Sequence, residues 1–362
     1  ADGLVKRLDS RNLEGKLENA RGAVAIDRSR LDDADAHFAR ALALREAVFG
    51  RRHLEVANVL GNQGLIARRR GDLTRAEALQ REELEMLESL LGPQHPLVAR
   101  TLESLADVLQ EAGQRDAALA LVTRSLEIRQ QVLGPTHRLT LRSQQLLAEY
   151  ELKANNFDGA RQRLLALLAA WEPSSLDAAN IASRLAELER LAGRYELALK
   201  WSRTAQATFT SQLSERDDEV LWEREQEAEI LFEQGDAAAA QALLRPLEAE
   251  WRTREDAADR LADVLVARAR VSLRQRDGTA ALRLLDEARE LSLPLGAPAA
   301  VLSAIELVKA QALLSLGRRA DALRVATTAR QSLEGIRAPT EIAALDSFIA
   351  DTSGAAVGVQ NR

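Results

Sequence analysis

Apolar residues recur along this chain at intervals of three and four positions, the spacing that places them on one face of an α-helix. The positions that carry this pattern most plainly are Leu31, Leu73, Phe157, Tyr195, Phe38, Val122, Leu164 and Leu285. Runs of β-branched residues with period-two alternation, which would indicate strands, are missing. Ala, Leu, Arg and Glu dominate the sequence, and their side chains lose little rotamer freedom in a helix. The pattern therefore predicts an all-α fold.

Short clusters rich in Gly, Asn and Asp interrupt the apolar pattern at regular intervals. Eight clusters occur, and each ends in an alanine, here called the marker alanine: Ala34, Ala76, Ala118, Ala160, Ala198, Ala240, Ala281 and Ala322. A second small residue stands twelve positions before each marker: Gly22, Gly64, Ala106, Ala148, Ala186, Ala228, Ala269 and Ala310. Each unit is predicted to be a helical hairpin in which helix A, a tight turn and helix B follow one another. The paired small residues let the two backbones approach closely.

A single hairpin cannot cover both of its apolar faces, so neighbouring hairpins are expected to stack into a solenoid. The segment PTEIAALDSFIAD, residues 339–351, reads as a capping helix with Thr340 at its N-cap. Residues 352–362 are small and polar and read as a flexible tail.

The strongest internal repeat lies in residues 41–160, which include ALALREAVFGRRHLEVANVLGNQGLIARRRGDLTRAEAL and LLGPQHPLVARTLESLADVLQEAGQRDAALALVTRSLEIRQQVLGPTHRLTL. The alanine–leucine pair, the arginine, the Gly-x-x-His connector and the glycine turn resemble the tetratricopeptide repeat in its 42-residue, kinesin-light-chain-like form. The resemblance implies a right-handed α-solenoid of about eight hairpins plus the capping helix. Units one to four are expected in residues 1–170, and more divergent units five to eight in residues 171–338.

The three connector histidines, His53, His95 and His137, invite a metal-binding interpretation. Each follows a glycine by three positions and marks the same place in successive units. Stacked units separate such residues by roughly 10 Å, the diameter of a helix, so their rings cannot share one metal ion. We interpret them as connector residues. The glycines before them are expected in the left-handed conformation that ends a helix.

Composition and motifs narrow the function further. The net charge is −6, aromatic residues make up 3% and cysteine is absent. No basic field or base-stacking pattern indicates nucleic acid, and no apolar run reaches the length of a membrane span. Phosphate-loop, dinucleotide, serine-hydrolase and zinc-protease motifs are also missing. We therefore predict no enzyme activity, no catalytic residue, no cofactor and no metal, in a soluble piece that lies in the cytoplasm or, as part of a membrane kinase, in the periplasm.

The resemblance places partner binding on the concave face, at positions eighteen, fifteen, eleven and eight residues before each marker alanine. These positions and their neighbours give the candidate groove residues Arg100, Glu103, Asp107, Arg142, Glu149, Glu187, Arg190, Trp222, Glu225 and Glu229. Trp222 is expected on the exposed side of its helix, as an anchor. The acids predict a protein or peptide partner with a basic segment. The alternative is that this face is only solvated, and that its charged residues form ion pairs within one helix, such as Arg100–Glu103 and Glu187–Arg190.

The resemblance implies three functions. One is a protein-interaction scaffold that binds a partner segment in its groove. Another is the extracytoplasmic sensor domain of a bacterial Ser/Thr kinase, with which the missing initiator Met agrees. The third is a small peptide-sensing regulator.

Overall fold

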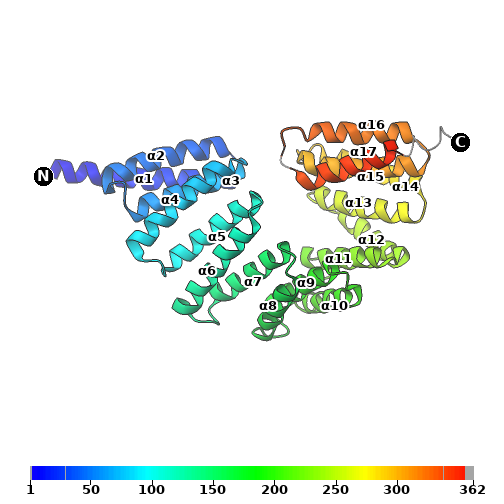
Figure 1. Ribbon diagram of the computed structural model, residues 1–362, viewed down its shortest axis with the longest axis horizontal. Helices are drawn as coiled ribbons and strands as arrows, with labels where there is room; N and C mark the ends of the chain where they lie inside the picture. Colours follow the sequence, from blue (N-terminus) through cyan, green and yellow to red (C-terminus); the bar gives the residue numbers. More distant parts are fainter. Residues whose placement is uncertain (1, 29, 337, 355–362) are drawn as a thin grey trace. The chain divides into compact units, whose positions relative to one another are not determined.

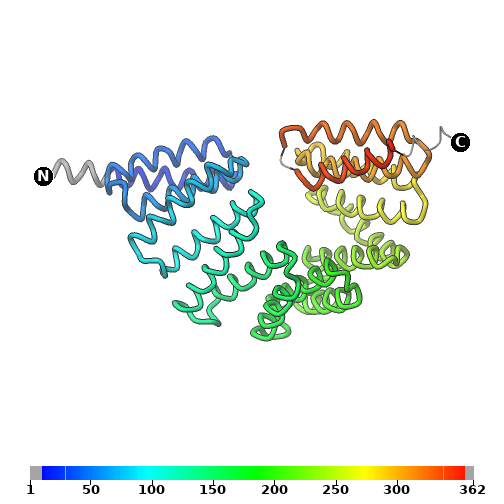
Figure 2. Tube along the Cα trace, in the orientation of Figure 1, coloured from blue at the N-terminus to red at the C-terminus, as the bar shows by residue number. Residues whose placement is uncertain are grey.

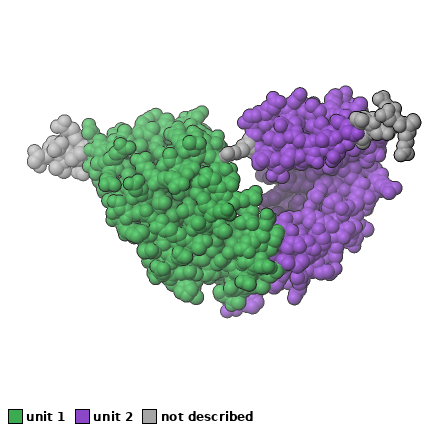
Figure 3. Space-filling view, viewed as in Figure 1, with its two compact units in different colours: residues 1–171 green, residues 172–362 purple. Residues whose placement is uncertain are grey.

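The computed structural model describes residues 2–28, 30–336 and 338–354, with side chains from residue 10 onward. Every regular element among these residues is an α-helix (Figure 1). The chain forms two compact units, residues 1–171 and 172–362, coloured separately in Figure 3. We call them the first array and the second array and describe each by itself. The predicted all-α repeat fold is confirmed.

Eight hairpins follow one another along the chain, and the tube in Figure 2 traces their alternating directions. The first array contains α1 (Asp2–Asp27), α2 (Leu31–Phe49), α3 (Leu54–Arg69), α4 (Leu73–Leu91), α5 (Pro96–Glu111), α6 (Arg115–Leu133), α7 (Arg138–Lys153) and α8 (Phe157–Ala169). The second array contains α9 (Leu176–Leu191), α10 (Tyr195–Gln212), α11 (Asp218–Gln234), α12 (Ala237–Trp251), α13 (Ala258–Arg274), α14 (Gly278–Ser292), α15 (Ala299–Ser315), α16 (Arg319–Ser332) and α17 (Pro339–Gly354). Odd-numbered helices from α1 to α15 are the A helices, and even-numbered helices are the B helices.

The small residues form the seam of each hairpin. All eight marker alanines are fully buried, and their Gly or Ala partners on helix A are buried as well. At Gly22, an added Cβ would lie 2.7 Å from the ring of Phe38, so a larger residue would push the helices apart. The predicted seam is confirmed in every unit.

The Gly-x-x-His connectors of the first array join helix B of one unit to helix A of the next. Gly50, Gly92 and Gly134 end helices at φ +79°, +86° and +90° with extended ψ. The positive φ was expected, but the left-handed conformation was not found. The observed region is even more restricted to glycine.

The three connector histidines have a role that the sequence interpretation missed. His53, His95 and His137 are the N-cap residues of α3, α5 and α7. The Nδ1 atom of each accepts a hydrogen bond from the backbone N–H two residues later, at 3.2, 3.1 and 3.2 Å. An imidazole thus satisfies one of the unpaired N–H groups at each helix start.

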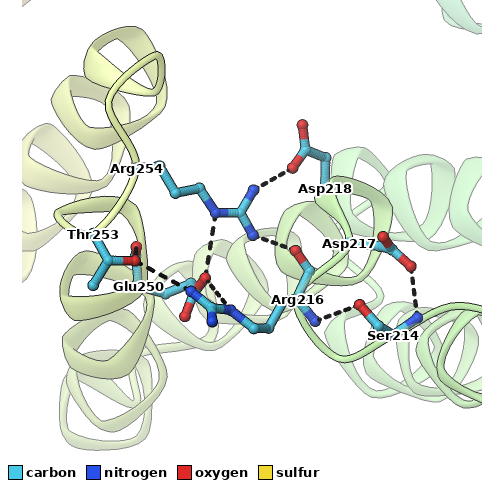
Figure 4. Close-up of polar contacts among 7 residues, drawn as sticks. All are labelled: Ser214, Arg216, Asp217, Asp218, Glu250, Thr253 and Arg254. Carbon is cyan, nitrogen blue, oxygen red and sulfur yellow. Dashed lines mark hydrogen bonds and ion pairs between the residues drawn. The ribbon is translucent and has the colours of Figure 1, made fainter.

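Two connectors of the second array are joined by side chains instead. Arg216 and Arg254 both contact the carboxylate of Glu250, at 2.7 and 3.3 Å (Figure 4). Arg254 also pairs with Asp218 at 2.6 Å and donates to the backbone carbonyl of Arg216. This network links the connector before α11 to the connector before α13, without a glycine or histidine.

Helix α17 closes the second array. It packs on α16 and α15, and its own Leu345 is fully buried. The helix begins at Pro339, so the prediction of Thr340 as N-cap is wrong. Proline suits this first position because its missing N–H would have no partner there. The helix ends at Gly354, three residues beyond the predicted end, and residues 355–362 of the predicted tail lie outside the described residues.

Candidate functional site

The ten candidate residues all lie on A helices. Arg100, Glu103 and Asp107 are on α5, and Arg142 and Glu149 are on α7. These five line one cavity of about 370 Å³ in the first array. Glu187 and Arg190 lie on α9, and Trp222, Glu225 and Glu229 lie on α11, all in the second array.

Glu103 is committed to a network inside the first array. Its carboxylate accepts hydrogen bonds from Ser125 at 2.9 Å and Ser143 at 2.7 Å, and it pairs with Arg129 at 2.8 Å. Arg129 is almost fully buried, and it also donates to Ser143 at 2.6 Å. Glu103 is therefore the counter-ion of a buried guanidinium, which leaves it little capacity for a partner.

Two other charged residues of this cavity, Asp107 and Arg100, also have partners within the chain. Asp107 accepts a hydrogen bond from the hydroxyl of Tyr150 at 2.7 Å and pairs with Arg68 at 3.0 Å. Burial, together with the bond to Asp107, raises the pKa of Tyr150, so its hydroxyl stays a donor. Arg100 lies 3.6 Å from Glu83 of α4. Arg142 is exposed and Glu149 is half-buried at the cavity wall.

A larger cavity, of about 630 Å³, lies in the second array. Helices α11, α13 and α15 form its walls, and the connector between α14 and α15 borders it. Its apolar lining includes Ala262, Val266, Ala267, Leu295, Val301, Ala304 and Ile305. Leu295 is 56% exposed and Val301 is 44% exposed, so one wall offers apolar surface to solvent.

Carboxylates line the same cavity: Glu225, Glu229, Asp259, Asp263 and Glu341. Arg270 is the one basic residue among the lining residues, and it is already paired with Glu229 at 2.7 Å and lies over the ring of Phe232. Within the described part of the chain, the other four acids make no hydrogen bond or ion pair through their side chains. This cavity therefore combines an apolar wall with unpaired negative charge.

Two of these acids have raised pKa values. Burial raises the pKa of Glu225 to about 7, and repulsion from Asp263 adds to this effect, while Arg260 opposes it. Burial also raises the pKa of Asp263, with Asp259 contributing. A nearby cation would favour the charged form of both groups. The cavity is therefore electrostatically suited to a ligand with a positive group.

A family model for the tetratricopeptide repeat matches three overlapping segments, residues 14–89, 55–131 and 97–172. Residues 14–172 are tetratricopeptide repeats. The family match ends where the second array begins, and there the repeat is carried by the hairpins and their buried seams. A comparison with curated protein sequences finds no match.

Solved structures show the same fold at low sequence identity. A tetratricopeptide repeat protein from Parabacteroides merdae is 18% identical and aligns over 83% of this chain and 99% of its own, with a TM-score of 0.58. The apo form of the quorum sensor NprR from B. thuringiensis is 14% identical, over 89% and 88% of the chains, with a TM-score of 0.63. Kinesin light chain TPR-like repeats from Podosopora anserina are 19% identical. They align over 56% of this chain and 99% of their own, with a TM-score of 0.50.

The remaining predicted residues, in the second array, differ from expectation. Trp222 is half-buried on α11, so the expectation that its side chain is exposed is wrong, and it does not line the 630 Å³ cavity. Arg190 pairs with Glu233 at 2.5 Å, and Glu187 is half-buried. The pairs expected within one helix are replaced, for Arg100 and Arg190, by partners on other helices.

Sequence reasoning missed Asp259, Asp263 and the apolar wall. The offsets used for the groove do reach this site when they are continued into units seven and eight. Eighteen residues before the markers stand Asp263 and Ala304, and fifteen before stands Val266. The acidic stripe predicted for units three to six stops short of these positions.

Among the described residues, no group of three or more acidic or histidine side chains is placed to hold a metal ion. In the same part of the chain, no helix is long and apolar enough to cross a membrane.

Proposed function

We propose that this tetratricopeptide repeat protein is a non-catalytic interaction module, and that the 630 Å³ cavity of the second array binds a partner segment. The segment carries a lysine or arginine next to an aliphatic residue. The observation that carries the proposal is the combination of four unpaired carboxylates with an exposed apolar wall in one cavity.

The cavity fits such a segment in size and chemistry. Its volume falls within the range of about 300–1,000 Å³ that is usual for ligand pockets. A cationic side chain reaching Glu225 and Asp263 would gain charge-assisted hydrogen bonds, and an adjacent aliphatic side chain would cover Leu295 and Val301. The resulting loss of exposed apolar area contributes about 25 cal/mol per Å².

The test is a peptide array of randomised 12-residue sequences probed with the full chain. We expect Lys or Arg beside Leu, Ile or Val to be enriched among the bound peptides. The double variant Glu225→Gln/Asp263→Asn should lose that selection. The variant Glu255→Gln/Glu290→Gln removes the same charge at exposed positions outside the cavity, and it should keep the selection. Enrichment of acidic peptides, or the same selection by the Glu225/Asp263 variant, would contradict the proposal.

Peptide sensing is a second candidate. The support is the likeness of this chain to the fold of the quorum sensor NprR, together with a cavity of ligand size. A sensor would bind one short peptide with high selectivity, and the unfolding temperature of the protein would change on binding. A scaffold would accept many related segments. The same array distinguishes them by the number of sequences bound. A sensor role in a Ser/Thr kinase system is the narrower form of this candidate, and a kinase domain encoded in the same gene is what it predicts.

A further inference from the structure

The second hairpin, α3 and α4, breaks the pattern of the other seven at two positions of helix B. Four residues after the marker alanine, the chain carries Phe38, Gln80, Val122, Leu164, Ser202, Leu244, Leu285 and Ala326. Seven residues after it, the chain carries Ala41, Glu83, Ser125, Leu167, Ala205, Leu247, Ala288 and Ala329. Glutamine and glutamate thus occupy places where the same fold is otherwise built with apolar or small residues.

Both side chains are buried and reach the A helix through a gap left by two glycines. Gln80 and Glu83 are each 3% exposed. An added Cβ at Gly61 would lie 2.5 Å from a carboxylate oxygen of Glu83, and one at Gly64 would lie 2.7 Å from Nε2 of Gln80. Each glycine inside a helix costs about 1 kcal/mol relative to alanine. Gly64 belongs to the seam of small residues, but Gly61 does not, since the other units carry a side chain at its position.

Above this gap lies a cavity of about 210 Å³. Its lining is polar: Asn58, Asn62, Gln80, Glu83, Arg100, Ser104 and Asp107 are among the residues that form it, together with Gly61 and Gly64. The amide of Gln80 is oriented by a hydrogen bond from Nε2 to the carbonyl of Gly61 at 3.2 Å. Its Oε1 atom has no partner among the described residues.

The charge of Glu83 is poorly compensated from within the chain. Arg100 is its nearest cation, at 3.6 Å, and Arg100 is itself 52% exposed. Burial raises the pKa of Glu83 to about 7, although Arg100 and a hydrogen bond with the side chain of Thr101 both act to lower it. The other charged lining residues, Arg68 and Asp107, are paired with each other at 3.0 Å. A buried acceptor that lacks a strong partner destabilises the fold unless a ligand supplies the donor.

We propose that this cavity of the first array is a binding site for a single guanidinium or ammonium group, which donates to the carboxylate of Glu83 between Gly61 and Gly64. The site is separate from the cavity of the second array and does not rest on the function proposed for it. The cation belongs either to a free amine or to a basic side chain of a protein, and the chemistry at Glu83 is the same for both.

A purely structural role for Glu83 explains fewer of these observations than a ligand site does. A Glu83–Arg100 pair that served only to join α4 to α5 would be expected at hydrogen-bonding distance and with both groups enclosed. Seven other hairpins close the same interface with Ala, Ser or Leu.

The experiment is NMR titration of the full chain, following the backbone amides of Gly61 and Gly64. The probes are N-acetyl-arginine amide, agmatine and N-acetyl-citrulline amide, which has the shape of arginine but no charge. We expect saturable shifts with the first two and at least tenfold weaker binding of the citrulline probe. Tighter binding of agmatine assigns a free amine as the ligand, and tighter binding of the capped arginine assigns a protein side chain.

The variants are chosen so that folding and binding are read separately. Glu83→Gln keeps the shape and removes the charge, and Glu83→Leu installs the residue that hairpins four and six carry. Both should abolish the shifts while the remaining spectrum stays dispersed. Glu85→Gln, at an exposed position of α4, should bind as the unmodified chain does. Equal binding of the citrulline probe, absence of saturable shifts, or unchanged binding by Glu83→Gln would overturn the proposal.

Discussion

The two arrays place a glutamate at the same position of their repeats and use it in opposite ways. Glu103 and Glu225 each stand fifteen residues before a marker alanine, on α5 and α11. Glu103 is surrounded by Ser125, Arg129 and Ser143. The residues at the corresponding positions beside Glu225 are Leu247, Trp251 and Val264, which are all buried and apolar. One acid therefore stabilises its array as the counter-ion of Arg129, and the other has no ion pair among the described residues.

This comparison teaches that a groove position is defined by its neighbours rather than by its own residue type. A stripe of acids read from the sequence contains both structural counter-ions and free carboxylates. The difference comes from helix B of the same unit and helix A of the next unit. These helices either carry a side chain that pairs with the acid or carry an apolar residue at that place. The largest effect is expected when Glu103 and Glu225 are each replaced by alanine.

Replacing Glu103 by Ala leaves the Arg129 guanidinium buried without a counter-ion, which we expect to cost about 3 kcal/mol. Replacing Glu225 by Ala removes a carboxylate that has no ion pair, so we expect no loss of stability at pH 8. Urea denaturation of the full chain, with both variants compared with the unmodified protein, measures the difference. Equal destabilisation by the two variants would show that the two positions are not used differently.

Buried acids in the second array should make it less stable as pH rises. Burial raises the pKa of Glu223, which is fully buried on α11, to about 7 from the ordinary value of 4.5. Between these values the folded chain holds a proton that the unfolded chain releases, so the free energy of unfolding falls as pH increases. The change reaches about 3 kcal/mol by pH 8.

The variant Glu223→Gln removes this penalty and keeps a polar group near Ser202. We expect it to raise the unfolding temperature at pH 8 and to change it little at pH 5. Glu219→Gln, at an exposed position in the first turn of α11, is the control, and any small effect that it has should be the same at both pH values. A gain for Glu223→Gln that is the same at both pH values would refute the linkage.

The smallest expected effect concerns the connectors. His95→Ala removes the N-cap of α5 and should cost about 1 kcal/mol. His95→Ser should restore most of the lost stability. Ser175 caps α9 of the second array in this way, since its side-chain oxygen accepts a hydrogen bond from a backbone N–H at 3.1 Å. Thermal unfolding of the two variants tests this ranking. If His95→Ala and His95→Ser were equally stable, the histidines would serve the connector in some way other than capping.

The helices, their number and their seams follow from the sequence because each depends on residues close in the chain. The marker alanines, their small partners and the apolar spacing predict eight hairpins, and all eight form. The connector glycines and histidines also act locally, although hydrogen bonding by the histidines was not expected. Local hydrogen bonds and helical periodicity carry this information, and both can be counted along a sequence.

The candidate site was decided only by tertiary structure. Whether Glu103 or Glu225 is free depends on side chains that lie more than twenty residues away, on two other helices. Repeat offsets placed Glu225 and Glu229 near the groove, but they did not show that Arg129 holds Glu103 or that Leu295 and Val301 form an apolar wall. The sequence by itself determined which helices form and where their backbones touch. Packing between helices then decided which charges are paired and which remain for a ligand, because Coulomb and desolvation energies depend on distance in space and not on separation along the chain.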